Sequence, residues 1–272
     1  MKSLVKKHNL VSSEEALAKG AWVKLICGAS NQDLTAIGDL CALYATAGVH
    51  CIDVAADEKV VQVAREALDW VQENLNIRPW LMISLSDGKD EHFRKAWFDP
   101  NLCPVHCPRP CEKACPAEAI KEQNGVLPSK CYGCGRCLPV CPHGLINEEN
   151  NHLEPKDYHY LISNISPDAV EIHTTPGRGK AFEATVEALV KAKVNFNRIA
   201  VSCGLGKHAT NAEELAQELW QRHSCLRKYG QRPIWQLDGR PMSGDIGIGS
   251  SNIAVTLWQE IRPLAPPGPL QL

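Results

Sequence analysis

The chain contains 272 residues, of which 44% are hydrophobic and 22% are charged, as is typical of a globular protein with one large core or two smaller ones. The 29 Lys and Arg nearly balance the 31 Asp and Glu, and the net charge of −2 gives no support to nucleic-acid binding, which requires a basic surface. No run of about 18 apolar residues predicts a transmembrane helix and no apolar core predicts a secretory signal, so we expect a cytoplasmic protein.

Strand and helix patterns alternate along the chain, starting with a short first helix for which Ser12 and Glu15 form a capping box. Short apolar, β-branched runs predict six strands, at residues 22–27, 50–55, 79–85, 169–173, 197–203 and 233–237. Helical periodicity predicts further helices at residues 31–47, 58–74, 155–164, 179–193, 211–225 and 251–261. Gly48 is expected to end the second helix and Asp57 to cap the third.

This alternation is typical of βαβ units and a parallel sheet. It predicts an α/β fold, a parallel (β/α) barrel-like or incomplete barrel domain, with an open doubly wound sheet as the alternative. The discontinuous barrel-like domain would comprise residues 1–98 and 146–262. Residues 263–272 contain four prolines and are expected to form an extended, mobile tail.

Eight of the thirteen cysteines lie within residues 99–145, a segment that we name the cysteine module. It follows the third predicted strand, so we expect it on the carboxyl-terminal face of the sheet, where ligands bind. An odd number of cysteines excludes complete disulfide pairing, and clustered cysteines in a reducing compartment are typical of metal or redox chemistry.

The second half of the cysteine module contains CYGCGRCLPVCP, the C-x2-C-x2-C-x3-C-P run of bacterial ferredoxins. Three thiolates of one tight loop converge on a four-iron cubane, Gly133 and Gly135 permit the turns, and the fourth cysteine ligates another cluster. The first half, CPVHCPRPCEKACP, ends in the same C-x3-C-P, although its earlier cysteines are spaced by three residues. The crossed pattern predicts two [4Fe–4S] clusters, one on Cys131, Cys134, Cys137 and Cys115 and the other on Cys103, Cys107, Cys111 and Cys141.

Two zinc sites of four cysteines each are the alternative, although zinc does not need the C-x3-C-P ending. The residues between Cys115 and Cys131 are expected to form a short helix and a turn. Trp97 and Phe98 are expected to seal the clusters from water. We expect His106 and His143 to be exposed or hydrogen-bonding neighbours of the ligands.

Candidate residues outside the cysteine module lie at the ends of predicted strands, namely Cys27, Asp53, His173, Cys203 and Asp238. A structural role for His173, and burial of the scattered cysteines as small hydrophobic side chains, are the simpler interpretations. The loop before the last helix could present its backbone amides to an anion, or simply form turns and a helix cap. Its candidate residues are Gly244, Gly247, Gly249, Ser250 and Ser251.

Five segments in a fixed order carry a family resemblance. Between residues 20 and 262 they are KLICGASNQDL, AGVHCIDVAAD, CPRPCEKACPAEAI, CYGCGRCLPVCPHG and DGRPMSGDIG. Together they resemble the cyanobacterial light-dependent period (LdpA) family. The resemblance implies iron–sulfur ligation by the eight cysteines of the module and no known catalytic residues. It also implies that the redox state set by photosynthetic electron flow is passed to the circadian clock, with the oscillator protein KaiA and the histidine kinase CikA as associated partners.

The preferred hypothesis is a redox-sensing binding protein, because two clusters are predicted without an evident catalytic set. The alternative is an iron–sulfur oxidoreductase whose α/β domain binds a flavin, a nicotinamide or a metabolite. An electron carrier alone ranks last, since the chain is far larger than that role needs.

Overall fold

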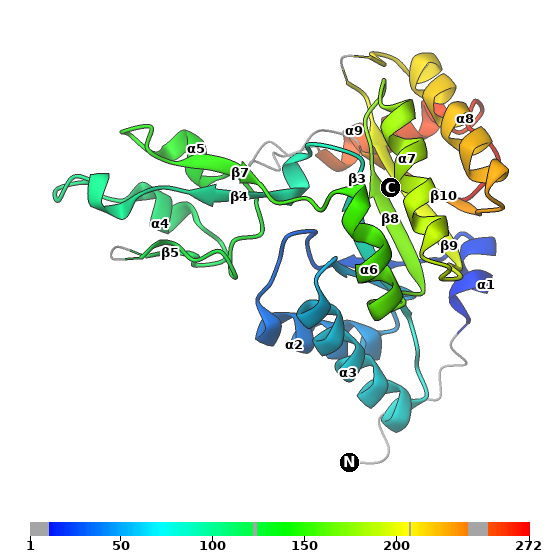
Figure 1. Ribbon diagram of the computed structural model, residues 1–272, viewed down its shortest axis with the longest axis horizontal. Coiled ribbons are helices and arrows are strands. Elements are labelled where there is room, and N and C mark those ends of the chain that lie inside the picture. The colour runs from blue at the N-terminus through cyan, green and yellow to red at the C-terminus, as the bar shows by residue number, and fades with distance from the viewer. Residues whose placement is uncertain (1–10, 122–123, 207, 239–249) are drawn as a thin grey trace.

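A curled sheet of parallel strands forms the body of the protein (Figure 1). The computed structural model describes residues 11–121, 124–206, 208–238 and 250–272. Within them, seven strands pair in the order β1-β2-β3-β8-β9-β10-β11. Their bounds are β1 (Lys24–Ile26), β2 (Cys51–Ala55), β3 (Trp80–Ser86), β8 (Ala169–His173), β9 (Arg198–Gly204), β10 (Pro233–Asp238) and β11 (Leu270–Gln271). The strands follow chain order across the sheet, as in a half-barrel, which contradicts the doubly wound alternative and confirms the incomplete barrel.

Helices alternate with these strands close to the predicted positions. Outside the cysteine module they are α1 (Ser13–Ala18), α2 (Leu34–Ala47), α3 (Glu58–Leu75), α6 (Pro155–Ile165), α7 (Gly179–Lys191), α8 (Ala212–Lys228) and α9 (Ser250–Ile261). The capping box of Ser12 and Glu15 is confirmed, as are the left-handed cap at Gly48 (φ 94°) and the Asp57 cap, which accepts from two backbone amides of α3. Among the described residues, no helix is both long and apolar enough to cross a membrane.

The two faces of the sheet have different chemistry. Side chains such as Ile83, Ile172 and Val201 point from one face into the main core, where the amphipathic helices cover them. On the opposite, inner face a smaller apolar layer surrounds Met82 and Ile234 at the amino-terminal ends of the strands, and α1 contributes Leu17 to it. Toward the carboxyl-terminal ends of the strands the inner face becomes polar, and the candidate site lies in this polar part.

The proline-rich C-terminus is not the separate extended tail that the sequence predicts. Its residues Leu270 and Gln271 form β11, which pairs in parallel with β10. The Trp235 amide donates to the Pro269 carbonyl oxygen at 2.8 Å, and its indole Nε1 donates to the Pro267 oxygen at 3.2 Å. The segment therefore covers one edge of the sheet, where proline is tolerated because one side of the strand needs no partner.

Removal of residues 263–272 is expected to destabilise the protein. Trp235 is fully buried, and the truncation exposes its indole and leaves its hydrogen bonds unmade, which costs about 2 to 4 kcal/mol of unfolding free energy. Urea denaturation followed by tryptophan fluorescence measures the loss. An unchanged unfolding midpoint would show that the segment contributes nothing to the domain.

The cysteine module projects to one side of the sheet, between β3 and α6 in the chain (Figure 1). An antiparallel pair, β4 (Arg94–Trp97) with β7 (Asn147–Asn150), forms its base after the short turn η1 (Glu91–Phe93). The elements of the module itself are η2 (Pro100–Leu102), α4 (Pro110–Ala114), β5 (Ile120–Lys121), β6 (Gly125–Val126) and α5 (Cys137–Val140). Strands β5 and β6 pair antiparallel where the sequence predicts a short helix. That prediction is wrong because Gly125, at φ 66°, has the left-handed backbone of a turn.

Candidate functional site

The thiols of the cysteine module form two groups of neighbours. Burial, followed by the thiols of Cys131, Cys134 and Cys115, raises the pKa of Cys137 to about 12. The pKa of Cys103 is raised by burial and then by Cys107, with a further contribution from Cys141, and the pKa of Cys111 is raised by burial and by Cys141 and Cys103. The two groups have the same members as the two predicted ligand sets, and ligation itself stays a prediction.

Backbone amides point at several of these sulfurs. Ala96 N–H donates to Cys131 Sγ at 3.4 Å, and Ala119 N–H donates to Cys115 Sγ at 3.2 Å. Burial opposes ionisation of Cys141, yet amides of residues 143–146 bond to it and hold its pKa below the usual value. Such donors stabilise thiolates and tune the clusters that thiolates bind.

Arg94, at the start of β4, fixes the loop that carries the ferredoxin-type cysteines. Its Nε donates to the Gly133 carbonyl oxygen at 2.9 Å, and its guanidinium also contacts the Cys134 carbonyl oxygen and the Glu148 carboxylate. Gly133 and Gly135 have φ of 77° and 76°, and a Cβ on either would collide with Arg94. The two glycines thus let the loop turn and let Arg94 lie directly against it.

Zinc and a four-iron cubane hold their thiolates at different separations. Among the described residues, no three cysteine sulfurs lie within 4.8 Å of one another. A tetrahedral zinc with Zn–S bonds of about 2.3 Å would bring its sulfurs to about 3.8 Å from each other. A four-iron cubane binds its thiolates at separate corners and holds them farther apart.

An apolar layer surrounds the cysteines. Phe98 is buried and packs with Cys111, Cys137 and Ile120, so it lies where it could shield the predicted clusters from water. Trp97 is 50% exposed, so that part of the prediction is wrong: alternate side chains of β4 point to opposite faces, and only one faces the cysteines. His106 and His143 are exposed, as predicted.

A charged cluster fills the middle of the inner face of the half-barrel. Lys24 of β1 is buried, and its Nζ bonds to the Glu171 carboxylate of β8 and lies 3.7 Å from Asp53 of β2. Gln236 of β10 bonds to Glu171 at 2.8 Å, and Ser84 bonds to Asp53 at 2.8 Å. Burial alone would raise the pKa of Glu171, but the Lys24 ammonium and the His173 ring hold it well below its usual range. Sequence analysis singled out Asp53 here and missed Lys24 and Glu171.

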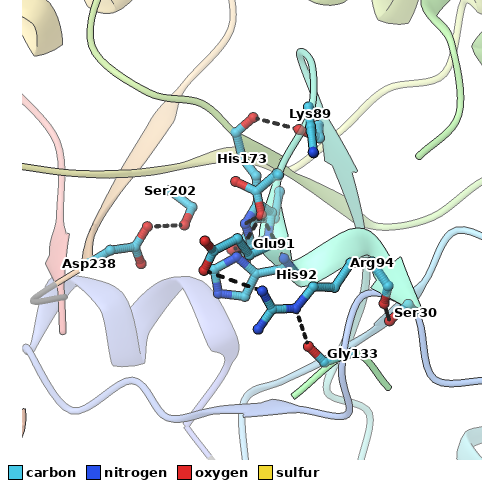
Figure 2. A network of polar contacts seen from close by, with 12 residues as sticks. Ser30, Lys89, Glu91, His92, Arg94, Gly133, His173, Ser202 and Asp238 are labelled. Atoms are coloured by element: carbon cyan, nitrogen blue, oxygen red, sulfur yellow. Dashed lines mark hydrogen bonds and ion pairs between the residues drawn. The ribbon is translucent and has the colours of Figure 1, made fainter. Parts of the chain in front are cut away.

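A second polar layer lies at the carboxyl-terminal ends of the strands (Figure 2). His173 Nε2 contacts Glu171 Oε1 at 3.0 Å, and His173 Nδ1 lies 3.9 Å from Asp90 Oδ1. His92 Nδ1 lies 2.7 Å from the same Asp90 oxygen. Burial works against the charge of His173, yet Glu171 raises its pKa to about 9, while the two histidines overcome burial and lower the pKa of Asp90 to about 2. His173 was a sequence candidate, whereas Asp90 and His92 were missed.

A cavity of about 360 Å³ opens beside this layer, between the strand ends and the base of the cysteine module. Asp90, His92 and Arg94 line it from the module side, and Thr174 and Asp238 line it from the sheet. Figure 2 shows Arg94 reaching from here to Gly133, and Asp238 bonded to Ser202. Arg94 therefore contacts both the cavity and the loop of Cys134.

The two cysteines at strand ends contribute no exposed chemistry. Cys27 and Cys203 are buried, and burial raises the pKa of Cys203 to about 12, which is the behaviour of small apolar side chains. The predicted anion site falls mainly on Gly244, Gly247 and Gly249, which lie outside the described residues. Ser250 is the first residue of α9.

Comparisons with known proteins match the chain over most of its length. Residues 103–152 match the domain described as the LdpA Fe-S cluster-binding domain, and residues 161–272 match the light dependent period A C-terminal domain. The curated protein "Light dependent period A" of Synechococcus elongatus is 45% identical over 260 residues, which cover 95% of this chain and 72% of that protein. A type I 3-dehydroquinate dehydratase from Clostridium difficile is similar in structure, with a TM-score of 0.43 and 11% identity over 91% of this chain and 72% of that one.

Proposed function

The chain belongs to the light dependent period A family, and from this premise we propose that it is a redox sensor whose two [4Fe–4S] clusters report the photosynthetic redox state to clock proteins. One observation carries the proposal: the thiols that influence the pKa values of Cys103, Cys111 and Cys137 fall into two sets, and each set joins cysteines from both halves of the cysteine module. A crossed pair of cubanes needs this arrangement. By the family resemblance, the partners are clock components such as KaiA and CikA.

The side chains of this chain would supply ligation and tuning. Cys131, Cys134, Cys137 and Cys115 would hold one cluster, and Cys103, Cys107, Cys111 and Cys141 would hold the other. When bound, the clusters supply one-electron chemistry. The amides of Ala96 and Ala119 and the layer around Phe98 would set how easily each cluster accepts that electron.

Arg94 could transmit the change in cluster charge to other parts of the protein. Reduction adds one negative charge per cluster, and the Arg94 guanidinium contacts the loop carbonyls beside Cys134 and also Glu148 on β7. The added negative charge would attract the guanidinium more strongly, so that it would bind the loop more tightly and Glu148 less tightly. Couplings of this kind are typically about 1 to 3 kcal/mol, which is enough to change partner affinity about fivefold or more.

The affinity for a clock partner is expected to differ about fivefold or more between the air-free oxidised protein and the same sample reduced with dithionite. Cys137→Ala tests the source of the difference, because it removes a ligand of one cluster and about half of the roughly eight iron atoms per chain. Cys225→Ala, outside the module, is the matched control and should retain all the iron. Equal affinities of oxidised and reduced protein would rule out sensing, and an iron-free chain would rule out the clusters.

The cavity beside Asp90 and His92 favours a second function, an iron–sulfur oxidoreductase acting on a small molecule. Its volume and polar lining suit a metabolite or part of a cofactor, and it lies next to the cysteine module. A flavin that copurifies with the anaerobic protein, or cluster-dependent turnover of a metabolite, would support this function over sensing. A protein that carries both clusters, binds no organic cofactor and changes partner affinity on reduction would decide against it.

A further inference from the structure

Three side chains with metal-binding atoms meet at the mouth of the half-barrel, away from the cysteines. Asp90, His92 and His173 each place one such atom within 4.8 Å of the other two. His173 ends β8, whereas Asp90 and His92 stand on the segment that leaves β3 for the cysteine module. Residues some eighty positions apart in the chain thus form one compact group of two imidazoles and one carboxylate.

A second, buried residue supports this group from below. Glu171 is 1% exposed, and its carboxylate contacts His173 Nε2 at 3.0 Å. The contact keeps the proton on Nε2 and turns Nδ1 toward Asp90, 3.9 Å away. Histidines that bind metals are commonly oriented in this way, by a carboxylate on the far ring nitrogen. Lys24 and Gln236 in turn hold Glu171, so the ring is set by a rigid layer of the sheet.

The group is accessible from the solvent on one side only. His173 is buried and Asp90 is nearly so, whereas the His92 side chain is 30% exposed and lines the 360 Å³ cavity with Asp90. An ion bound here would have protein ligands on its inner side and open positions toward the cavity. Asp238 also lines the cavity, and although burial raises its pKa, the charges of His173 and His92 favour its ionised form.

The simplest competing interpretation is a hydrogen-bonded trio without an ion. Asp90 caps the turn η1 by accepting the His92 amide at 2.9 Å, so one of its oxygens has a structural role already. That oxygen, Oδ1, is also the one that faces both histidine rings, and a carboxylate oxygen has lone pairs for an amide and an ion together. The capping role alone does not account for the converging ring of His173 or for the cavity. Two imidazoles and one carboxylate with open positions are the ligands typical of a first-row divalent transition ion.

We propose that Asp90, His92 and His173 form a site for one divalent transition-metal ion, separate from the cysteine clusters and open to the cavity. The ion would take the place of the proton on His173 Nδ1, and that proton would leave to the solvent. Its open positions would bind water or a small anionic ligand in the cavity. The proposal does not depend on the redox-sensing function, since none of the three residues lies within residues 99–145.

Manganese is the suitable probe, because Mn²⁺ prefers carboxylate and imidazole ligands over thiolates and so does not compete for the cysteines. Mn²⁺ is titrated into the anaerobic, cluster-loaded full chain in its oxidised state, and free Mn²⁺ is read from its six-line paramagnetic resonance signal. We expect one bound ion per chain. His92→Ala and Asp90→Asn are each expected to weaken binding at least tenfold, and His159→Ala, an exposed histidine on α6, should bind like the unmodified chain.

Iron content and cluster absorbance, measured on the same samples, show whether each variant is folded and loaded, so the result is separable from the fate of the redox proposal. His92 is the decisive position because its partly exposed ring can be removed with little loss of packing. The site is refuted if the loaded chain leaves the free Mn²⁺ signal unchanged, or if folded His92→Ala and Asp90→Asn proteins bind as tightly as the His159→Ala control.

Discussion

Lys24→Met is expected to lower the free energy of unfolding by about 3 to 5 kcal/mol at neutral pH, because it removes the ammonium that balances two buried carboxyl groups. Glu171 and Asp53 are 1% and 2% exposed, and the Lys24 ammonium contacts the first directly and lies 3.7 Å from the second. Methionine has nearly the same length and flexibility as lysine, so packing changes little. The decrease in unfolding free energy therefore measures the effect of removing the charge. Chemical denaturation of the variant and the unmodified chain measures it.

Lys59→Met, at an exposed position on α3, is the matched control and should change stability by less than about 0.5 kcal/mol. The double variant Lys24→Met/Glu171→Gln should recover part of the lost unfolding free energy, since it also removes the buried negative charge of Glu171. A Lys24→Met protein as stable as the control would show that water reaches the inner face and screens the carboxylates.

The destabilisation caused by Lys24→Met depends on pH, and the ion pair between Lys24 and Glu171 determines whether it grows or shrinks as the pH falls. The pKa of Glu171 lies well below its usual range in the folded protein, so the pair stabilises the fold above the unfolded pKa of about 4.3 and loses its effect as pH falls through the folded value. Without Lys24, the buried charge of the same carboxylate destabilises the fold at neutral pH, and protonation removes this destabilisation. We therefore expect the difference between variant and unmodified chain to shrink steadily as the pH falls toward and below about 4.

The features that could be predicted from the sequence are local ones. Helices such as α3 follow from a periodic apolar stripe and a cap at Asp57, and the cysteine run at 131–141 carries its chemistry in its own spacing. β11 was missed because two residues after several prolines carry no strand signal, and they form a strand only where Trp235 offers hydrogen bonds. The hairpin of β5 and β6 was missed for a similar reason, since a glycine turn overrides the helical composition around it.

The inner face of the half-barrel could not be predicted, because its partners are distant in the sequence. Lys24 and Glu171 are 147 positions apart and become neighbours only through the register of β1, β2, β3 and β8. The segment around Asp90 and His92 offered one usable signal, an acidic residue and a histidine directly after a buried strand. Position at a carboxyl-terminal strand end was the criterion that selected His173, and it applies equally to these two residues.

Gly133→Ala should abolish the cluster of the second half of the module, with loss of about half of the iron. The new Cβ would collide with the Arg94 carbonyl oxygen, and an alanine at φ 77° adds backbone strain of about 1 kcal/mol or more. The loop can relieve the collision only by moving away from Arg94, which gives up the Nε bond to the Gly133 oxygen and displaces the neighbouring thiols of Cys131 and Cys134.

Gly144→Ala separates the collision from the strain. Gly144 also has a positive φ, 61°, and lies beside Cys141, but a Cβ there meets nothing within 4 Å and its amide hydrogen remains available to the Cys141 sulfur. This variant should lose about 1 kcal/mol of stability from the backbone alone and keep nearly all of its iron. Iron and sulfide analysis of the two anaerobic proteins makes the comparison. If both variants lose iron equally, the conformation of the glycines controls cluster retention, and the contact of Arg94 with the loop does not. The proposal that Arg94 transmits the cluster charge to the cavity would then lose its structural basis.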